Sequence, residues 1–224
     1  MNKRKMLLIN GSPRKKGTSH AILAALQQLA EEKGLEAEAV HAIDFLDGKA
    51  DMGSLRPVIR ESAALCLSAP LYFDALPYPA IWFLERMQEA YPNELKGKAL
   101  FAISQGGFPD DTLHKPPLEQ CRIFAIQNGM NWCGGLAHGG GAIINGTPLS
   151  KLGKKGKRMA AGLRMALDAA SSGKQMPEEA KKLFSNRVPR WLLPLLGMLL
   201  NQMARNTAKK TGSDYLCKPY LDKE

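Results

Sequence analysis

The sequence has no paired cysteines, no long apolar run and no cluster of metal ligands, and each absence excludes a class of protein. Its four cysteines are scattered over 224 residues without a C-x-x-C pair, so zinc and iron–sulfur sites have no local ligand framework. The longest apolar stretch, residues 191–200, is interrupted by Pro194 and Gly197. A bilayer span needs about 20 apolar residues. The four histidines are also far apart, and we expect neither a metal site nor a catalytic triad.

A secretory signal is missing as well. The apolar run near the N-terminus covers residues 6–9 alone, whereas a signal peptide needs about 7–15 apolar residues there. We therefore expect a cytoplasmic protein whose cysteines are reduced thiols.

Acidic residues are scarce in the last third of the chain. Residues 1–150 hold 15 Lys/Arg and 15 Asp/Glu, whereas residues 151–224 hold 16 Lys/Arg and 6 Asp/Glu, so the net charge of +10 comes entirely from the second segment. Such a segment can bind nucleic acid, an anionic membrane or an acidic partner, or it can simply form a solvated basic surface. Its cations are not set in a recognition helix and aromatics there are few, so we expect no nucleic-acid binding.

Short apolar runs alternate with amphipathic stretches over the first two thirds of the chain. The expected strands are 5–10, 36–42, 63–68, 98–104 and 132–145, and the expected helices between and after them are 19–33, 77–91, 117–129 and 156–171. Strands that are apolar on both faces and separated by helices predict a parallel sheet covered on both sides. We expect this α/β domain to span residues 1–173.

The remaining segment, 174–224, is expected to be a basic helical extension with helices at 177–185 and 189–206. Along the second of these, large apolar side chains share one broad face: Trp191, Leu192, Leu195, Leu196, Leu199, Leu200 and Met203. Pro194 should kink this helix or mark its true start. A second subunit, the sheet domain or a membrane surface could cover the face; we favour the subunit, and thus a homodimer.

The loop after the first strand has the chemistry of a phosphate site. It reads Asn10-Gly11-Ser12-Pro13-Arg14-Lys15-Lys16-Gly17-Thr18-Ser19. Backbone N–H groups at a helix N-terminus attract anions, and hydroxyls add donors. The pattern is neither G-x-x-x-x-G-K-[ST], because its lysines precede the second glycine, nor G-x-G-x-x-G, because it holds two glycines.

Residues 9–19 resemble the opening of the NADPH-dependent FMN reductase family, which belongs to the flavodoxin-like superfamily. The resemblance implies a flavodoxin-like three-layer sandwich with a five-stranded parallel sheet. It also implies that five residues contact the FMN phosphate: Ser12, Arg14, Gly17, Thr18 and Ser19. The alternative is an empty turn followed by a helix that Thr18 or Ser19 caps.

Two further loops resemble the flavin loops of this family. After the third strand come Pro70, Leu71, Tyr72 and Phe73, and after the fourth come Gln105, Gly106 and Gly107. By resemblance, the two aromatics border the isoalloxazine ring, and the amides of the two glycines approach its pyrimidine edge. The aromatics could instead be buried under the next helix, and the glycines could form a tight turn with positive φ. Pro77 and Pro79 depart from the family pattern.

The resemblance implies an FMN-dependent oxidoreductase that passes reducing equivalents from NAD(P)H to a small acceptor, such as a quinone, flavin, nitro or azo compound. FMN would carry out the redox chemistry, and the sequence offers no catalytic residue of its own. His114 could donate a proton to a reduced quinone or be an ordinary loop residue. The glycine-rich fifth strand, which includes His138, could contact a neighbouring subunit. The alternatives are a flavodoxin-like electron carrier and a non-catalytic interaction module with a basic C-terminal segment.

Overall fold

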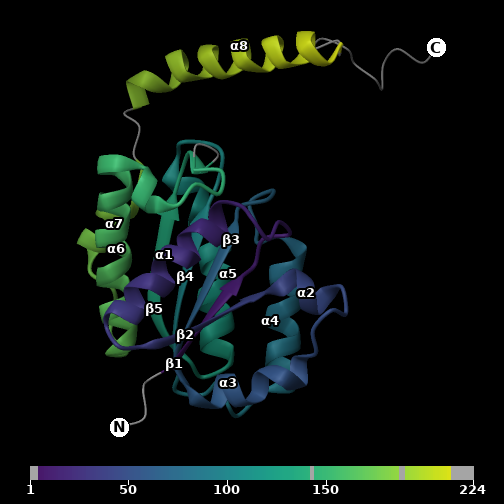
Figure 1. Ribbon diagram of the computed structural model, residues 1–224, viewed down its shortest axis with the longest axis vertical. Coiled ribbons are helices and arrows are strands. Elements are labelled where there is room, and N and C mark those ends of the chain that lie inside the picture. Colours follow the sequence, from purple (N-terminus) through teal and green to yellow (C-terminus); the bar gives the residue numbers. More distant parts are fainter. Residues whose placement is uncertain (1–4, 142–143, 187–189, 213–224) are drawn as a thin grey trace, which may run out of the picture. The chain divides into compact units, whose positions relative to one another are not determined.

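The computed structural model describes residues 5–141, 144–186 and 190–212, and the chain divides into two compact units, Met1–Arg187 and Val188–Glu224. The first unit is a three-layer α/β sandwich around a five-stranded parallel sheet, with helices on both faces (Figure 1). This confirms the predicted flavodoxin-like fold. No helix among the described residues is long and apolar enough to cross a membrane.

The five strands lie in the order β2-β1-β3-β4-β5, and all neighbouring pairs are parallel. Their bounds are Lys5–Asn10 for β1, Glu36–His41 for β2, Ser62–Pro70 for β3, Ala99–Gln105 for β4 and Asn131–His138 for β5. The chain moves from β1 to β2 in one direction and then returns across β1 to β3. This reversal makes the point between β1 and β3 a topological switch point, and sheets of this kind bind ligands beyond the carboxyl ends of the strands at such a point.

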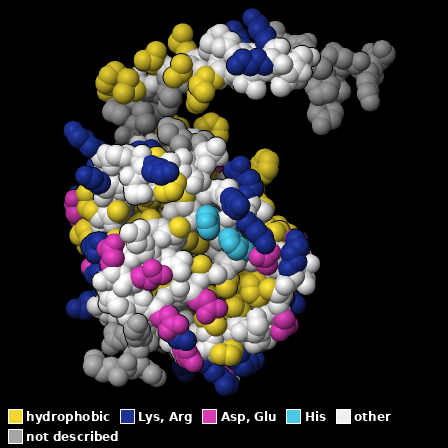
Figure 2. Space-filling view, viewed as in Figure 1, with side chains coloured by type: hydrophobic (Ala, Val, Ile, Leu, Met, Phe, Trp, Pro, Cys, Tyr) yellow, Lys and Arg dark blue, Asp and Glu magenta, His cyan; other side chains and the backbone are white. Residues whose placement is uncertain are grey.

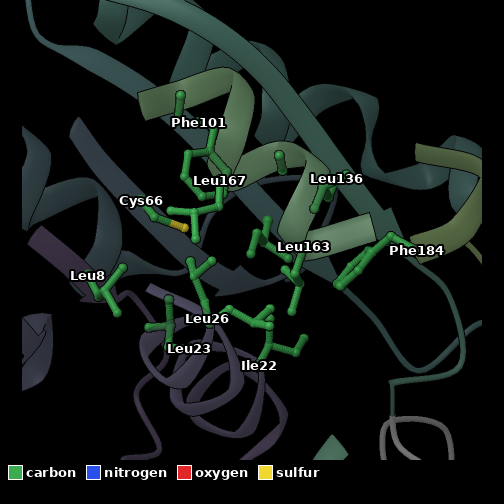
Figure 3. Packing of buried hydrophobic residues seen from close by; sticks show 14 of the residues in the cluster. Leu8, Ile22, Leu23, Leu26, Cys66, Phe101, Leu136, Leu163, Leu167 and Phe184 are labelled. Atoms are coloured by element: carbon green, nitrogen blue, oxygen red, sulfur yellow. The ribbon is translucent and has the colours of Figure 1, made fainter. Parts of the chain in front are cut away.

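Two helical layers cover the sheet (Figure 1). One contains α1 (Thr18–Glu32), α6 (Gly153–Ser171) and α7 (Glu178–Phe184), and the other contains α2 (Ala42–Leu46), α3 (Arg56–Glu61), α4 (Tyr78–Ala90) and α5 (Lys115–Gln127). Short 3₁₀ helices lie at Met52–Leu55 (η1), Asp111–His114 (η2) and Leu149–Lys151 (η4). Figure 3 shows the apolar core under α1 and α6, to which alternate strand residues such as Leu8, Cys66 and Phe101 contribute.

The first helix begins differently from expectation. Thr18 is already helical, Gly17 is the N-cap residue, and no side chain among the described residues caps the helix. The interpretation of Thr18 or Ser19 as the cap is therefore wrong, because the Thr18 hydroxyl donates instead to the carbonyl of Gly141. The expected stop is correct, since Gly34 follows the helix with a φ of 73°.

The fifth strand ends at His138, so the predicted span of 132–145 is too long. The glycines that follow pack tightly against their own chain. A Cβ at Gly139 would lie 2.8 Å from the backbone of residues 108–110, and one at Gly141 would lie 2.3 Å from Oε1 of Gln105. These glycines are needed inside the unit, which corrects their interpretation as a contact with a neighbouring subunit.

The compact unit extends beyond the expected boundary at residue 173, because α7 packs on α6 and β5. Phe184 is fully buried, and a Cβ at Gly162 of α6 would lie 2.7 Å from the carbonyl oxygen of Ala180. The amide of Met176 also donates to the carbonyl of Cys133 in β5, at 2.8 Å. This segment therefore belongs to the sheet domain, and the extension begins near residue 188.

The second unit holds the 3₁₀ helix η5 (Arg190–Leu192) and the helix α8 (Leu193–Thr211). Pro194 lies in the first turn of α8, where its missing N–H costs no intrahelical hydrogen bond. The expectation that Pro194 marks the true start of this helix is confirmed. Cys217 lies outside the described residues.

Candidate functional site

Three loops meet at the carboxyl edge of the sheet, as the sequence predicts. The amide of Gly11 donates to the Ser68 carbonyl at 2.9 Å, which joins the loop after β1 to the end of β3. The amide of Leu71 donates to the Gln105 carbonyl at 2.8 Å, which joins the loop after β3 to the end of β4. Gly11 is also close to α4, because a Cβ on it would lie 2.8 Å from the Cβ of Ala80. The three segments are thus connected to one another at the carboxyl ends of β1, β3 and β4.

The loop after β1 is held by two successive side-chain turns. Oδ1 of Asn10 accepts from the amide of Ser12 at 3.1 Å, and Oγ of Ser12 accepts from the amide of Arg14 at 3.1 Å. The side-chain nitrogen Nδ2 of Asn10 is itself 2.9 Å from Nδ1 of His41. Since Oγ of Ser12 acts as an acceptor here, its hydrogen remains free to donate to a bound anion.

The N-terminus of α1 faces this loop with unused donors. In a helix the first N–H groups have no carbonyl partner within the helix, and the amides of Thr18, Ser19 and His20 have none among the other described residues. Arg14 and Lys16 are exposed beside them, and Lys15 pairs with Asp44. Free amides, a helix dipole and cations make a cradle that fits a phosphate group.

The two hydroxyls at the start of α1 have different roles. The Thr18 hydroxyl donates to the carbonyl of Gly141 at 2.8 Å, so Thr18 can offer only its amide to a phosphate. Oγ of Ser19 accepts from Nε2 of Gln105 at 3.4 Å, and its hydrogen remains free. A Cβ at Gly17 would meet only the Cβ of Arg14, at 3.9 Å, so no crowding within the chain explains this glycine.

The second loop is a tight hairpin that carries its aromatics outward. Tyr72 and Ala75 exchange two backbone hydrogen bonds of 3.0 Å, and the two residues between them, Phe73 and Asp74, have φ angles of 47° and 58°. Such a two-residue turn normally holds Asn or Gly at these positions. Pro70 is buried at the end of β3, whereas the exposed fraction is 42% for Tyr72 and 103% for Phe73. The alternative of a buried aromatic pair is therefore wrong.

The third loop has fewer free backbone N–H groups for a ligand than the sequence predicts. The amide of Gly106 donates to the carbonyl of His138 at 3.1 Å, and its own carbonyl accepts from the amide of Gly141 at 2.6 Å. Gly106 is therefore committed within the protein, which corrects its expected role as a flavin contact. Gly107 is exposed, and a Cβ on it would meet nothing within 4 Å. Neither glycine has a positive φ, so the tight-turn interpretation is also wrong.

The imidazole of His114 lies beneath this loop. His114 is only 1% exposed, its Nδ1 is 2.8 Å from Oγ of Ser104, and its Nε2 has no partner among the described residues. A Cβ on Gly106 would lie 3.1 Å from the ring, so the histidine fills the space that this glycine leaves. Burial lowers the pKa of His114, although Asp111 opposes the shift, and the ring is neutral at pH 7.

A second set of residues holds the loop after β5 in place. The sequence analysis did not identify these residues. Nδ1–H of His138 donates to the carbonyl of Phe184 at 2.7 Å, and the amide of Gly139 donates to Oδ1 of Asp111 at 2.7 Å. The side-chain amide of Asn186 donates to the Gly139 carbonyl at 3.0 Å. A histidine directly before three glycines was the available signal, but its partners lie 28 to 47 residues away in the sequence.

Known proteins share this architecture. Residues 4–114 match the model of the family described as NADPH-dependent FMN reductase. No curated protein matches the sequence. Similar solved structures include general stress protein 14 in complex with FMN from Treponema denticola (12% identity, TM-score 0.53, 76% of this chain and 99% of that one). A flavodoxin from Pseudomonas aeruginosa is 18% identical, with a TM-score of 0.53 over 73% of this chain and 99% of that one.

An NADPH-quinone reductase from P. pentosaceus is also similar, at 13% identity and a TM-score of 0.53, over 72% of this chain and 96% of that one. These identities are low, so the likeness shows the fold alone. The residues that match the family model include the β1 loop, the β3 loop and the beginning of the β4 loop. Over residues 4–114, just under half of its length, the chain is therefore similar to the NADPH-dependent FMN reductase family.

Proposed function

We propose that this protein binds FMN at the carboxyl edge of its sheet and passes reducing equivalents from NAD(P)H to a small acceptor. The main support for the proposal is the start of α1, where three backbone amides without partners among the described residues lie beside two hydroxyl groups whose hydrogens are free to donate. A dianionic phosphate is a group that satisfies all of these donors at once.

The residues present fit the cofactor. Ser12, Ser19 and the first amides of α1 would hold the phosphate, with Arg14 adding charge from the exposed side of the loop. Gly107 leaves open space where its amide can meet a ring edge. Tyr72, which is half-exposed on the hairpin, would border the ring from the second loop.

FMN, when bound, would supply the redox chemistry, taking electrons from the nicotinamide and giving them to the acceptor. The chain would contribute binding and orientation. The open space at Gly107 and the outward aromatics leave one side of the site accessible, so donor and acceptor would use the same place in turn. The chemical class of acceptor we propose is a quinone, flavin, nitro or azo compound.

Calorimetric titration with FMN and with riboflavin tests the binding site. Charge-assisted hydrogen bonds to the phosphate should make FMN bind at least tenfold more tightly than riboflavin, which lacks the phosphate. Equal affinities would refute the phosphate assignment.

The reaction is tested separately. The FMN-loaded protein should lose its flavin absorbance within seconds of anaerobic mixing with NADPH or NADH and regain it on addition of menadione. A flavin that stays oxidised for minutes with both nucleotides would favour an electron carrier over an enzyme.

A further inference from the structure

The helix α8 exposes an unusual amount of apolar surface. The side chains concerned, with their exposed fractions, are Trp191 77%, Leu195 64%, Met198 71%, Leu199 57%, Leu200 43% and Met203 57%. They all lie in η5 and the first three turns of α8, whereas the last two turns are polar. Surface of this kind costs free energy in water and calls for a partner.

The charge on the second unit is mainly positive. Residues 188–224 hold six Lys/Arg and three Asp/Glu, a net charge of +3, and the acidic residues all follow residue 212. The space-filling view of α8 shows the apolar side chains at one end and the cations towards the other (Figure 2). Lys209 and Lys210 also interact favourably with the dipole at the helix C-terminus.

The first unit has cations where the chain leaves it. Asn186, two residues before the second unit begins, is bound to Gly139 at the carboxyl edge of the sheet. The first turns of α6, which start at the same edge, carry exposed Lys154, Lys157 and Arg158 and no acid in the first turn. Cations at a helix N-terminus oppose the helix dipole, so they do not serve the stability of α6.

We propose that α8 is an interfacial helix that holds this protein on an anionic bilayer surface. Its apolar end would enter the headgroup region, and Lys209 and Lys210 would face anionic lipid. A broad apolar face, an excess of cations over acids and an exposed Trp191 are typical of helices that lie in a membrane surface. The inference does not depend on the proposed function, because none of these residues belongs to the flavin site.

A second copy of the chain is the competing occupant, and the sequence alone favoured it. In a symmetric pair, however, each copy of residues 188–224 would bring a net charge of +3, from six Lys/Arg and three Asp/Glu. Self-association would therefore bring two units of like net charge together, which is unfavourable. An anionic surface turns the same charges into an attraction.

Co-sedimentation of the full chain with vesicles tests the proposal. We expect at least tenfold more bound protein with equimolar phosphatidylglycerol and phosphatidylcholine than with phosphatidylcholine alone, and weaker binding at high salt. Brominated acyl chains should quench the fluorescence that Trp191→Phe removes. Absence of the full chain from the pellet with anionic vesicles would overturn the proposal.

Two matched variants separate the apolar contribution from the charge. Leu199→Asp and Asn201→Asp add the same charge to the same helix, about 200° apart around its axis. Leu199→Asp should reduce vesicle binding at least tenfold, and Asn201→Asp far less. Lys209→Gln with Lys210→Gln should abolish the preference for anionic lipid. A lipid-free dimer in light scattering that Leu199→Asp converts to a monomer would assign the face to a second copy and overturn the proposal.

Discussion

The hydroxyl of Thr18 donates a 2.8 Å hydrogen bond to the backbone carbonyl of Gly141, a residue 123 positions further along the chain. This bond joins the first turn of α1 to the loop after β5. Gln105 adds a second connection from β4, because its side-chain amide donates to Oγ of Ser19. The phosphate cradle is therefore positioned by the far edge of the sheet as well as by its own strand.

Replacing Thr18 with valine tests this connection. The change keeps the side-chain shape and leaves the Gly141 carbonyl without its donor, which should lower the free energy of unfolding by about 1–3 kcal/mol. Urea denaturation measures the effect, and Thr18→Ser should restore most of it. If Thr18→Val is as stable as the wild type, the hydrogen bond does not hold the loop.

Ser12 should contribute directly to binding. Removing its hydroxyl with Ser12→Ala deletes a donor to the phosphate and should weaken FMN binding about fivefold to tenfold, equivalent to roughly 1–1.4 kcal/mol. Riboflavin affinity should change much less, because the phosphate is absent. Ser150→Ala, an exposed serine outside the cradle, serves as the control. An equal loss for the two flavins would contradict a phosphate contact.

The hairpin Tyr72–Ala75 holds stored strain. Phe73 and Asp74 both have positive φ, a conformation that favours Asn and Gly. The double substitution Phe73→Asn with Asp74→Gly should raise the free energy of unfolding by about 1 kcal/mol. Turnover with NADPH and menadione should fall if Phe73 borders the site, and thermal denaturation measures the stability. Lower stability would mean that the aromatic side chain makes a stabilising contact.

Acid should destabilise the fold through its buried histidines. Burial lowers the pKa of His114 and of His138, and that of His41 shifts in the same direction. Below about pH 6.5 the unfolded chain binds protons that the folded chain does not, so stability is full above this pH and falls as the pH decreases. Each histidine should contribute up to about 1.4 kcal/mol per pH unit until its folded-state pKa is reached.

The variant His138→Asn keeps a donor for the Phe184 carbonyl but removes one titrating group. Urea denaturation between pH 5 and pH 8 should therefore show a smaller slope below pH 6.5 for the variant than for the wild type. Identical slopes would mean that His138 is protonated equally in both states.

Strands β1, β3 and β4 could be predicted because they are apolar on both faces, a local pattern typical of a covered parallel sheet. The loop that we propose to bind phosphate could be identified as a candidate because its hydroxyls and cations lie within residues 12–19. The N-cap of α1 could not be predicted, because the Thr18 hydroxyl donates to a carbonyl after β5 that no local sequence pattern identifies. The burial of Phe184 was not predicted for the same reason, since it depends on the packing of α7 on α6.

The short helices α2 and α3 are five and six residues long, too brief for a periodic apolar pattern to identify them. The burial of His114 under Gly106 could not be predicted either, because it depends on how the loop after β4 packs on the imidazole ring. The homodimer and the cytoplasmic location remain predictions, of which light scattering tests the first.

The close fit of Gly11 limits how a ligand can enter. Its backbone lies so near Ala80 that even one added carbon would be 2.8 Å from the Ala80 side chain. A side chain at position 11 would therefore force the first loop away from the start of α4. At Gly107, by contrast, an added Cβ would meet nothing within 4 Å. A flavin would then meet the least crowding at the third loop, while the first loop stays packed against α4.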